Sequence, residues 1–222
     1  MSAPANIVFL GPPGSGKGTY AVRVAERLGI PAISTGEILR QAIRAGTPLG
    51  REAQAYVEGG KLVPDEVMER VLADRLAQAD CARGFILDGF PRTAAQAGQL
   101  DRALAARGAG VTHAVLVEAG EELVLRRLGG RRTCPSCGAV FNLDTLPPRR
   151  EGICDRCGAA LVLRDDDKPD TVRRRLAVHA EQSAPVEAVY RQRGLLHGVD
   201  GSAPLEQVVA GIVRTVQVAA AS

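Results

Sequence analysis

A glycine-rich loop near the N-terminus carries the first group of residues with the types and spacing that chemistry requires. Residues 11–19 read Gly-Pro-Pro-Gly-Ser-Gly-Lys-Gly-Thr, which satisfies the Gly-x4-Gly-Lys spacing of a phosphate-binding P-loop. Glycines allow successive backbone N–H groups to turn toward a phosphate, and a helix that starts at the loop adds positive potential. Lys17 can reach the terminal phosphates as a point charge. The loop therefore predicts a site for a polyphosphate.

The residue after Lys17 departs from the general pattern of such loops. A Ser or Thr usually stands there and holds Mg²⁺ through its hydroxyl, whereas this chain has Gly18, with Thr19 next. Because Gly18 has no hydroxyl, we expect phosphates and water molecules to provide most of the ligands of the Mg²⁺ ion.

Four of the five cysteines form the second group. Cys134 and Cys137 make one C-x2-C pair, Cys154 and Cys157 make another, and 16 residues separate the pairs. In a chain for which no export signal is expected, this spacing favours a tetrahedral Zn²⁺ site, with a pair of redox dithiols as the alternative. Four thiolates leave no open coordination position, so the zinc is predicted to be structural. Cys81 stands alone, and we expect it to be a small core residue.

Composition excludes several classes of protein. The formal net charge is +3 and aromatic residues make up 3% of the chain, too few for the stacking platforms of a single-stranded nucleic-acid binder. A zinc-ribbon nucleic-acid protein with an ATPase core is therefore disfavoured. No apolar run approaches the ~18 residues that a membrane span needs. The N-terminal segment lacks a basic region of the secretory type, so a cytoplasmic location is expected.

The elements that must position these residues follow from hydrophobic periodicity. Short apolar runs predict strands, and the patterns between them predict helices, among them one over about 16–28 and one from about 204. The strands are expected at 6–11, 30–34, 84–88 and 113–118, with a weaker fifth at 196–200. This alternation predicts an α/β fold: a parallel five-stranded sheet flanked by helices, with phosphate ligands at the carboxyl ends of the strands.

Two stretches do not fit the core pattern and are predicted to be mobile inserts. The first covers residues 34–63 and ends in a hinge-like Gly pair. The second covers residues 131–166 and contains the four paired cysteines. The core is then expected to comprise residues 1–33, 64–130 and 167–222.

Several stretches together resemble the nucleoside monophosphate kinases, and the adenylate kinases in particular. The loop has the form Gly-x-Pro-Gly-x-Gly-Lys-Gly-Thr, residues 34–40 read Ser-Thr-Gly-Glu-Ile-Leu-Arg, and residues 84–93 read Gly-Phe-Ile-Leu-Asp-Gly-Phe-Pro-Arg-Thr. Arg131-Arg132 and the run 165–167 followed by 171–175 complete the resemblance. It extends from Asn6 to Arg214 and suits the long-lid bacterial type, in which the second insert is a zinc-binding lid and the first binds AMP.

The resemblance implies the reversible reaction of Mg·ATP and AMP to give two ADP, within adenine nucleotide homeostasis. The alternative is another monophosphate kinase that uses UMP, CMP or GMP on the same architecture, and a third reading is a degenerate kinase kept as a structural partner. The implied partners are ATP, AMP and ADP, with no nucleic acid and no membrane, and the implied state is a monomer. The implied cofactors are Mg²⁺ with ATP and a structural Zn²⁺.

The resemblance also assigns residues to these substrates. Catalytic roles fall to Lys17, Arg92, Arg131, Arg164 and Arg175. ATP contacts fall to Gly14, Ser15, Gly16, Lys17, Gly18, Thr19, Arg127, Arg131, Val140, Phe141 and Ala203. AMP contacts fall to Thr35, Arg40, Lys61, Leu62, Val63, Gly89, Phe90, Pro91, Arg92, Gln96, Arg164 and Arg175. Asp88 would hold Mg²⁺ through water.

Other polar residues are expected to have no such role. His113, His179 and His197 lack a paired motif and are interpreted as structural or surface residues. The acidic run 165–167 is interpreted as a solvated hinge face, and of the arginines at 173–175 only Arg175 is expected to point inward.

Overall fold

Five parallel strands form the central sheet of the computed structural model, which describes residues 4–219. The predicted core extends to residues 1–3 and 220–222, which lie outside the described part. The strands occur in the order β2-β3-β1-β4-β7. Their bounds are Ala5–Leu10 (β1), Ala32–Ser34 (β2), Gly84–Asp88 (β3), His113–Glu118 (β4) and Leu196–Asp200 (β7). The predicted α/β class and five-stranded parallel sheet are confirmed, although β2 is shorter than predicted because it pairs only from Ala32.

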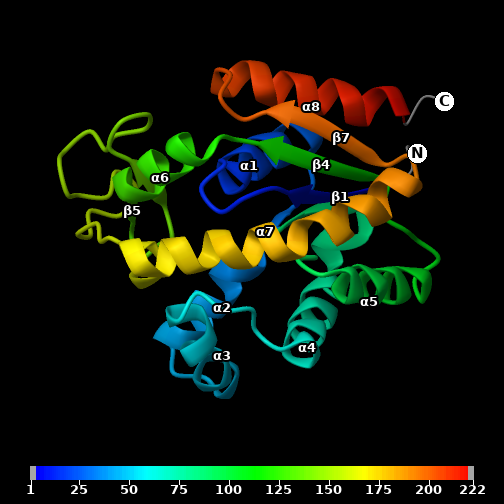
Figure 1. The fold of residues 1–222 in the computed structure, drawn as a ribbon, viewed down its shortest axis with the longest axis horizontal. Helices are drawn as coiled ribbons and strands as arrows, with labels where there is room; N and C mark the ends of the chain where they lie inside the picture. The colour runs from blue at the N-terminus through cyan, green and yellow to red at the C-terminus, as the bar shows by residue number, and fades with distance from the viewer. Residues whose placement is uncertain (1–3, 220–222) are drawn as a thin grey trace.

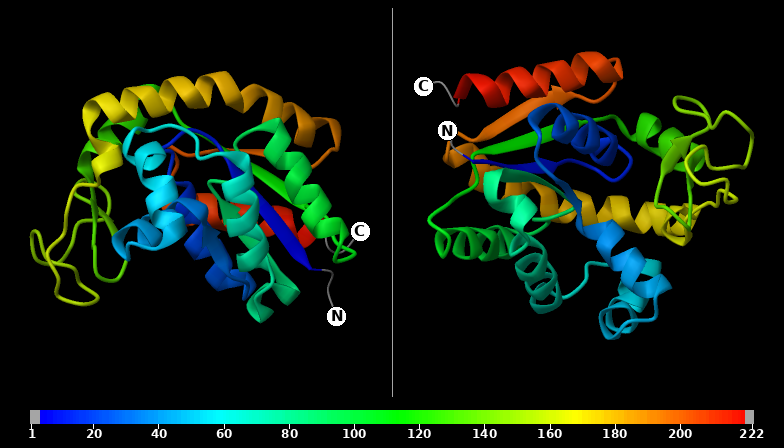
Figure 2. Two further views of the ribbon diagram at one scale, coloured as in Figure 1. Left: turned by 90° about the horizontal axis from the view of Figure 1, so that it is seen from below. Right: turned by 180° about the vertical axis from the view of Figure 1, so that it is seen from behind.

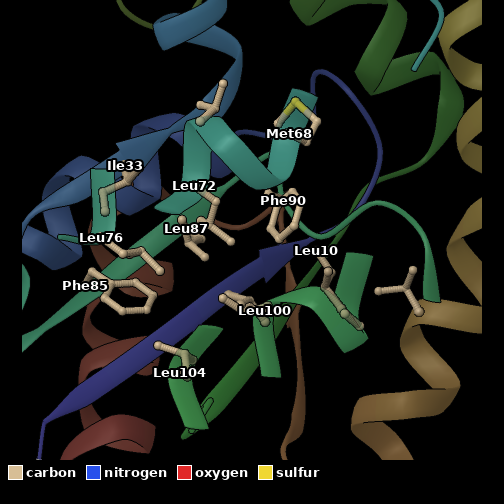
Figure 3. Packing of buried hydrophobic residues seen from close by; sticks show 14 of the residues in the cluster. Leu10, Ile33, Met68, Leu72, Leu76, Phe85, Leu87, Phe90, Leu100 and Leu104 are labelled. Atoms are coloured by element: carbon tan, nitrogen blue, oxygen red, sulfur yellow. The ribbon is translucent and has the colours of Figure 1, made fainter. Parts of the chain in front are cut away.

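Helices cover both faces of this sheet (Figures 1 and 2). Alternate residues of β1 point to opposite faces, as a strand's period of two requires. Ile7 and Phe9 pack in a cluster with residues of α1 (Lys17–Leu28) and α8 (Leu205–Ala219). Val8 and Leu10 pack in a second cluster with residues of α4 (Asp65–Leu76), α5 (Ala94–Ala105) and α7 (Pro169–Gln192). Figure 3 shows Leu10 and Leu87 of the strands among leucines of α4 and α5. Among the described residues, no helix is long and apolar enough to cross a membrane.

The segment 34–63 folds as two short helices, α2 (Thr35–Arg44) and α3 (Pro48–Glu58). Gly50 lies where the two helices meet: a Cβ on this residue would stand 2.1 Å from the carbonyl oxygen of Ala42. Only a glycine permits so close an approach of one helix to the backbone of the other. The pair packs beside the carboxyl end of β2.

The segment 131–166 follows α6 (Glu121–Gly130) and leads into α7. It contains a two-stranded antiparallel sheet of β5 (Arg131–Thr133) and β6 (Val140–Asn142), which the sequence analysis did not predict because three-residue strands show no periodicity. Its buried apolar cluster consists of Cys134, Ala139, Phe141 and Cys154. A core this small contributes little stability, so we expect a further cross-link to stabilise the segment. Short 3-10 turns, η1 (Ala79–Arg83) and η2 (Asp165–Asp167), complete the chain.

Candidate functional site

The P-loop connects β1 to α1 at the carboxyl end of the sheet. Gly11, Gly14 and Gly16 all have left-handed backbone conformations, with φ of +123°, +84° and +105°. At Gly11 a Cβ would also lie 2.3 Å from the carbonyl oxygen of Val117. No side chain caps the N-terminus of α1, so the first N–H groups of this helix are available to an anion.

Lys17 points back into this loop. Its Nζ donates hydrogen bonds to the carbonyl oxygens of Gly11 and Pro12, both at 2.7 Å. Burial lowers the pKa of Lys17 to about 8; Asp88 opposes this shift, and Arg92 contributes to it. Negative charge bound beside Lys17 would therefore stabilise its protonated form and raise its pKa.

Asp88 ends β3 and faces the P-loop. A Cβ on Gly18 would lie 3.2 Å from Asp88 Oδ2. The carboxylate therefore lies next to the position that a side chain at residue 18 would take. A carboxylate beside a phosphate-binding loop is a ligand that Mg²⁺ uses directly or through water. The residues present therefore fit the ion.

Nine of the twelve residues assigned to AMP line one pocket beneath α2. These nine are Thr35, Arg40, Lys61, Leu62, Val63, Gly89, Arg92, Gln96 and Arg175. The sequence analysis missed the other lining residues, Gly36, Leu39, Val57, Gly60, Met68 and Asp166. For the apolar ones, helical spacing predicts only core packing, so it gives no signal of a pocket wall.

Phe90 and Pro91 do not line that pocket. The Phe90 side chain is fully buried in the core between α4 and β1, and Pro91, joined to it by a cis peptide bond, is also buried. Gly89 and Arg92, on either side of this pair, do line the pocket. The pair anchors the segment that presents them.

Gln96 is held in place by two polar partners. Its Oε1 accepts a hydrogen bond from the Arg92 backbone N–H at 2.8 Å, and its Nε2 donates to Asp65 Oδ1 at 2.7 Å. Thr93 caps α5 by accepting from the Gln96 backbone N–H. The amide side chain is thus fixed at the pocket, and Asp65 is an orienting residue that the sequence analysis missed.

Four arginines surround two buried carboxylates where α7 begins. Arg131 makes a bidentate contact with Asp167, Nε to Oδ2 at 2.7 Å. Arg175 Nη1 lies 3.1 Å from Asp166 Oδ2 and 3.1 Å from Asp167 Oδ1. Arg40 approaches Asp166 at 3.6 Å, and Arg164 donates to the Thr133 hydroxyl at 2.7 Å. We call Arg40, Arg131, Arg164 and Arg175 the arginine cluster.

The prediction of a solvated acidic face at 165–167 is wrong for two of the three residues. Asp165 is exposed, but Asp166 and Asp167 are only 6% and 4% exposed. Although burial alone would raise the pKa of the Asp166 carboxyl, Arg175 and Arg40 hold it below its usual value. Arg175 of the following helix stabilises both carboxylates, together with Arg40 and Arg131 from distant parts of the sequence. No local pattern in the run reveals these contacts.

The arginine cluster keeps an excess of positive charge despite these two carboxylates. Burial, followed by repulsion from Arg40 and Arg131, lowers the pKa of Arg164 to about 9. Arg92 lines the pocket together with Arg40 and Arg175, and its Nε donates to the Gly89 carbonyl oxygen at 2.8 Å. A polyanion entering here would be attracted by several guanidinium groups that carboxylates only partly neutralise.

Arg127 joins the P-loop to the turn after β7. Its two terminal nitrogens donate to the carbonyl oxygens of Ser15 and Gly201, both at 2.8 Å. Hydrogen bonds in the guanidinium plane leave its face available for stacking on a base. Ala203, in the same turn, is half-buried against the cluster of α1 and α8.

Val140 and Phe141 point in different directions from β6. The Val140 side chain is 41% exposed, whereas Phe141 is 8% exposed and packs with Cys134 and Cys154. The Phe141 ring is therefore part of the small core of this segment.

The four paired cysteines come together in space. Their Sγ atoms all lie within 4.8 Å of one another, with 3.4 Å between Cys134 and Cys157 and 3.6 Å between Cys137 and Cys154. Tetrahedral Zn²⁺ with bonds of about 2.3 Å places its sulfur ligands about 3.8 Å apart, so the site fits this ion. A hydrogen bond from the Cys137 backbone N–H leads the effects that lower the pKa of Cys134 to about 6, which favours the thiolate.

The remaining single-residue expectations can be placed as well. Cys81 is buried in the core, as predicted. Arg175 faces inward while Arg173 is 73% exposed, which agrees with the prediction for this arginine run. His113 and His197 lie on neighbouring strands with their rings 5.7 Å apart.

Comparison with known proteins gives a consistent result. The sequence model described as adenylate kinase matches residues 9–195. An adenylate kinase of Lachnospira eligens is 49% identical over 208 residues, 94% of this chain and 98% of the relative. One from Pelobacter propionicus is 50% identical over 91% of this chain and 92% of the relative. One from Archaeoglobus fulgidus is 49% identical over 91% and 94% of the two chains.

Proposed function

The chain belongs to the adenylate kinase family of phosphotransferases, and we propose that it performs the family reaction, Mg·ATP + AMP ⇌ 2 ADP, between its P-loop and the pocket beneath α2. The observation that carries this proposal is the sharing of one arginine cluster by two anion sites. Arg40 and Arg175 line the pocket, and the positive charge of Arg131 and Arg175 also acts on Lys17 of the P-loop. Two phosphate-bearing ligands bound at these sites would meet at the cluster.

The acceptor in this reaction is already an anion, so the protein needs no general base. Its task is to align the two phosphate groups and to neutralise the charge that develops during transfer. Lys17 and the N–H groups of the P-loop hold the donor phosphates. Arg40 and Arg92 hold the acceptor phosphate, and Arg131, Arg164 and Arg175 surround the group in transit.

Asp166 and Asp167 keep the arginine cluster assembled before substrate arrives. Without these carboxylates, four guanidinium groups would repel one another in a half-buried space. Substrate phosphates would supply further negative charge, because the four guanidinium groups outnumber the two carboxylates.

Asp88 is the residue placed to hold Mg²⁺, through water or directly. When bound with ATP, the ion neutralises charge on the phosphate oxygens.

Base selection falls to the inner wall of the pocket. Thr35 and Gln96 offer a hydroxyl and an amide to a purine edge, with backbone groups of residues 61–63 beside them. Asp65 fixes the Gln96 amide. Leu39, Val57 and Met68 provide apolar contact for the ring.

The two inserts are proposed to close over the substrates, 34–63 over AMP and the lid 131–166 over ATP. Closure would exclude water, which otherwise competes as the acceptor. A structural Zn²⁺ on the four cysteines would hold the lid together. Thiolate ligands of this kind persist in a reducing compartment, which supports a cytoplasmic location. One chain supplies both sites, which supports activity as a monomer.

Two neighbouring arginines on α7 test this assignment. Arg175→Lys removes the planar fork from the cluster, so we expect ADP formation from ATP and AMP to fall by a factor of about 100 or more. Arg173→Lys, on the exposed side of the same helix turn, is the matched control and should keep wild-type turnover. Equal turnover of the two variants would refute the role of the cluster.

A further inference from the structure

The amide of Gln96 is held between two partners of opposite hydrogen-bonding character. Its Oε1 accepts from the backbone N–H of Arg92 at 2.8 Å, and its Nε2 donates to Asp65 Oδ1 at 2.7 Å. A backbone N–H can only donate, and an ionised carboxylate can only accept. If the amide turned over, donor would face donor and acceptor would face acceptor. Only one orientation of the Gln96 amide therefore satisfies both partners.

The surroundings of Gln96 leave this side chain little freedom to adopt another position. Gln96 is in the first turn of α5, where its backbone N–H donates to the hydroxyl of the N-cap residue Thr93 at 3.1 Å. Asp65 is in the first turn of α4, and the two helices pack in one apolar cluster (Figure 3). Gln96 is only 2% exposed, so an unmatched polar atom of its side chain would carry the full penalty of burial.

The pocket beneath α2 has Gln96 in its wall, whereas Asp65 is not among the described residues that line it. Asp65 can therefore affect a base bound there only through Gln96. An amide oxygen has two lone pairs, and an amide nitrogen has two N–H groups. After the contacts with Arg92 and Asp65 are made, one lone pair on Oε1 and one N–H on Nε2 remain for a ligand.

We propose that Asp65 is a positioning residue that determines base specificity, because it fixes the Gln96 amide in the orientation that selects a 6-amino purine over a 6-oxo purine. The inference rests on the proposed function, since it requires a purine monophosphate in the pocket beneath α2. It extends that function by naming the group that makes the pocket reject a base of nearly the same shape.

The hydrogen-bonding patterns of the two bases provide the reason for this selection. Adenine presents an amino donor beside an unprotonated ring nitrogen, which is an acceptor. The remaining lone pair and N–H of Gln96 match these two groups. Hypoxanthine, a 6-oxo purine, presents the reverse: a carbonyl acceptor beside a ring N–H donor. To match it, the amide would have to turn over and lose its contacts with both Asp65 and Arg92, and a site that leaves buried polar groups unpaired rejects the substrate that causes it.

Removal of the Asp65 carboxylate should weaken this selection without abolishing it. In Asp65→Ala only the backbone N–H of Arg92 would still oppose the turned amide. The preference for the 6-amino base should then fall by the contribution of one hydrogen bond to a charged group, a factor of about 10 or more. Asp65→Asn retains an oxygen that can accept from Nε2, so its preference should stay within about threefold of that of the wild type.

The ratio of kcat/KM for AMP to kcat/KM for IMP, with Mg·ATP as the donor, tests the proposal. Chromatographic separation of IDP from ADP makes slow transfer to IMP measurable. We expect Asp65→Ala to lower the ratio by a factor of about 10 or more. Glu66→Ala is the matched control, because it removes a carboxylate from an exposed position in the same first turn of α4; it should keep the wild-type ratio.

This ratio distinguishes positioning of the amide from a merely structural role of Asp65. Partial unfolding of a variant lowers the rates with AMP and IMP by the same factor, so it leaves the ratio unchanged. An Asp65→Ala ratio equal to that of the wild type would overturn the proposal. An Asp65→Asn ratio as low as that of Asp65→Ala would also overturn it, because the acceptor oxygen would then not be the cause.

A second measurement tests whether Asp65 acts through Gln96. In a Gln96→Leu background, Asp65→Ala should change the ratio by less than about twofold, because the side chain that it orients is absent. A fall as large as in the wild-type background would overturn the proposal.

The rate of the wild-type protein with AMP separates this inference from the proposed function. If no ADP forms from Mg·ATP and AMP, the proposed function itself fails. If ADP forms but Asp65→Ala keeps the wild-type ratio, only the inference fails.

Discussion

The Asp88 carboxylate lies beside the place where a side chain on Gly18 would stand, 3.2 Å from Oδ2 to the Cβ position. In the proposed Mg²⁺ site, these two residues take the place of the single hydroxyl of the general P-loop pattern. Gly18 leaves the space free, and Asp88 reaches toward the loop from the neighbouring strand β3. The proposed Mg²⁺ ligand is therefore a residue 70 positions away from Gly18 in the sequence.

Replacing Asp88 should change the Mg²⁺ requirement. For Asp88→Asn we expect the Mg²⁺ concentration at half-maximal rate to rise by about 10–100-fold, because outer ligands of a metal contribute that much to its affinity. Asp74→Asn, at an exposed position of α4, removes the same charge and should leave the requirement unchanged. Identical Mg²⁺ curves for the two variants would contradict this role.

The lowered pKa of Lys17 should weaken ATP binding at alkaline pH. Its pKa of about 8 in the free protein means that the ammonium is lost above that pH, whereas bound phosphates favour the charged form. The Kd for ATP should therefore rise by up to about tenfold per unit above pH 8. Calorimetric titration from pH 7 to 9.5 measures it, and a flat profile would argue against the assignment.

The same lowered pKa has the opposite effect on the stability of the free protein. Between about pH 8 and 10.5 the unfolded chain binds more protons at Lys17 than the folded chain does, so this group makes the free energy of unfolding rise with pH. Lys17→Met should remove this contribution. Lys17→Arg should nearly abolish turnover without unfolding the protein, because a planar fork cannot replace the ammonium in the loop.

Asp167 and Asp165 form a matched pair for testing the arginine cluster. Asp167→Asn leaves Arg131 and Arg175 without their shared carboxylate, and we expect a loss of about 3–5 kcal/mol in unfolding free energy. Asp165→Asn, at an exposed position, should cost under about 1 kcal/mol. Saturating Mg·ATP with AMP should restore part of the loss at Asp167, as thermal unfolding would show; equal stability of the two variants would disprove the account.

Zinc removal should affect the lid before the core. Metal analysis should find one zinc per chain, and a chelator should expose 131–166 to proteolysis while the core stays folded. Cys154→Ser should lose the metal, whereas Cys81→Ser, which changes a cysteine outside the cluster, should retain it. Retention of zinc by Cys154→Ser would show that the four cysteines are not its ligands.

Gly50 tests the packing of the AMP insert. Gly50→Ala places a methyl group against the Ala42 carbonyl, and we expect it to cost about 1–3 kcal/mol and to raise the KM for AMP. Gly211→Ala on α8 has open space around it and should stabilise the protein by about 0.5–1 kcal/mol. An AMP KM unaffected by Gly50→Ala would indicate that the insert tolerates the shift.

The strands and the P-loop could be predicted because their signals are local. The buried strands appear as continuous apolar runs, and the glycines of residues 11–16 recur at positions where the backbone has φ above +60°. The grouping of the four cysteines into one cluster could likewise be predicted from their spacing. Each of these features depends on residues close together in the chain.

The contacts that the sequence analysis missed are all long-range. Asp166 and Asp167 resemble a solvated acidic run until Arg40 and Arg131 approach from other segments. Asp65 orients Gln96 from 31 residues away. Patterns in a single sequence carry no information on contacts between residues that are far apart in the chain.

The rate of ADP formation from Mg·ATP with each of AMP, UMP, CMP and GMP tests the central claim most directly. Thr35 and Gln96 in the pocket favour an adenine ring, so we expect kcat/KM for AMP to exceed that for each of the other three by at least about 100-fold. For each AMP consumed, one ATP should be lost and two ADP should be formed. A comparable or higher kcat/KM with UMP, CMP or GMP, or no ADP formed from AMP, would contradict the account.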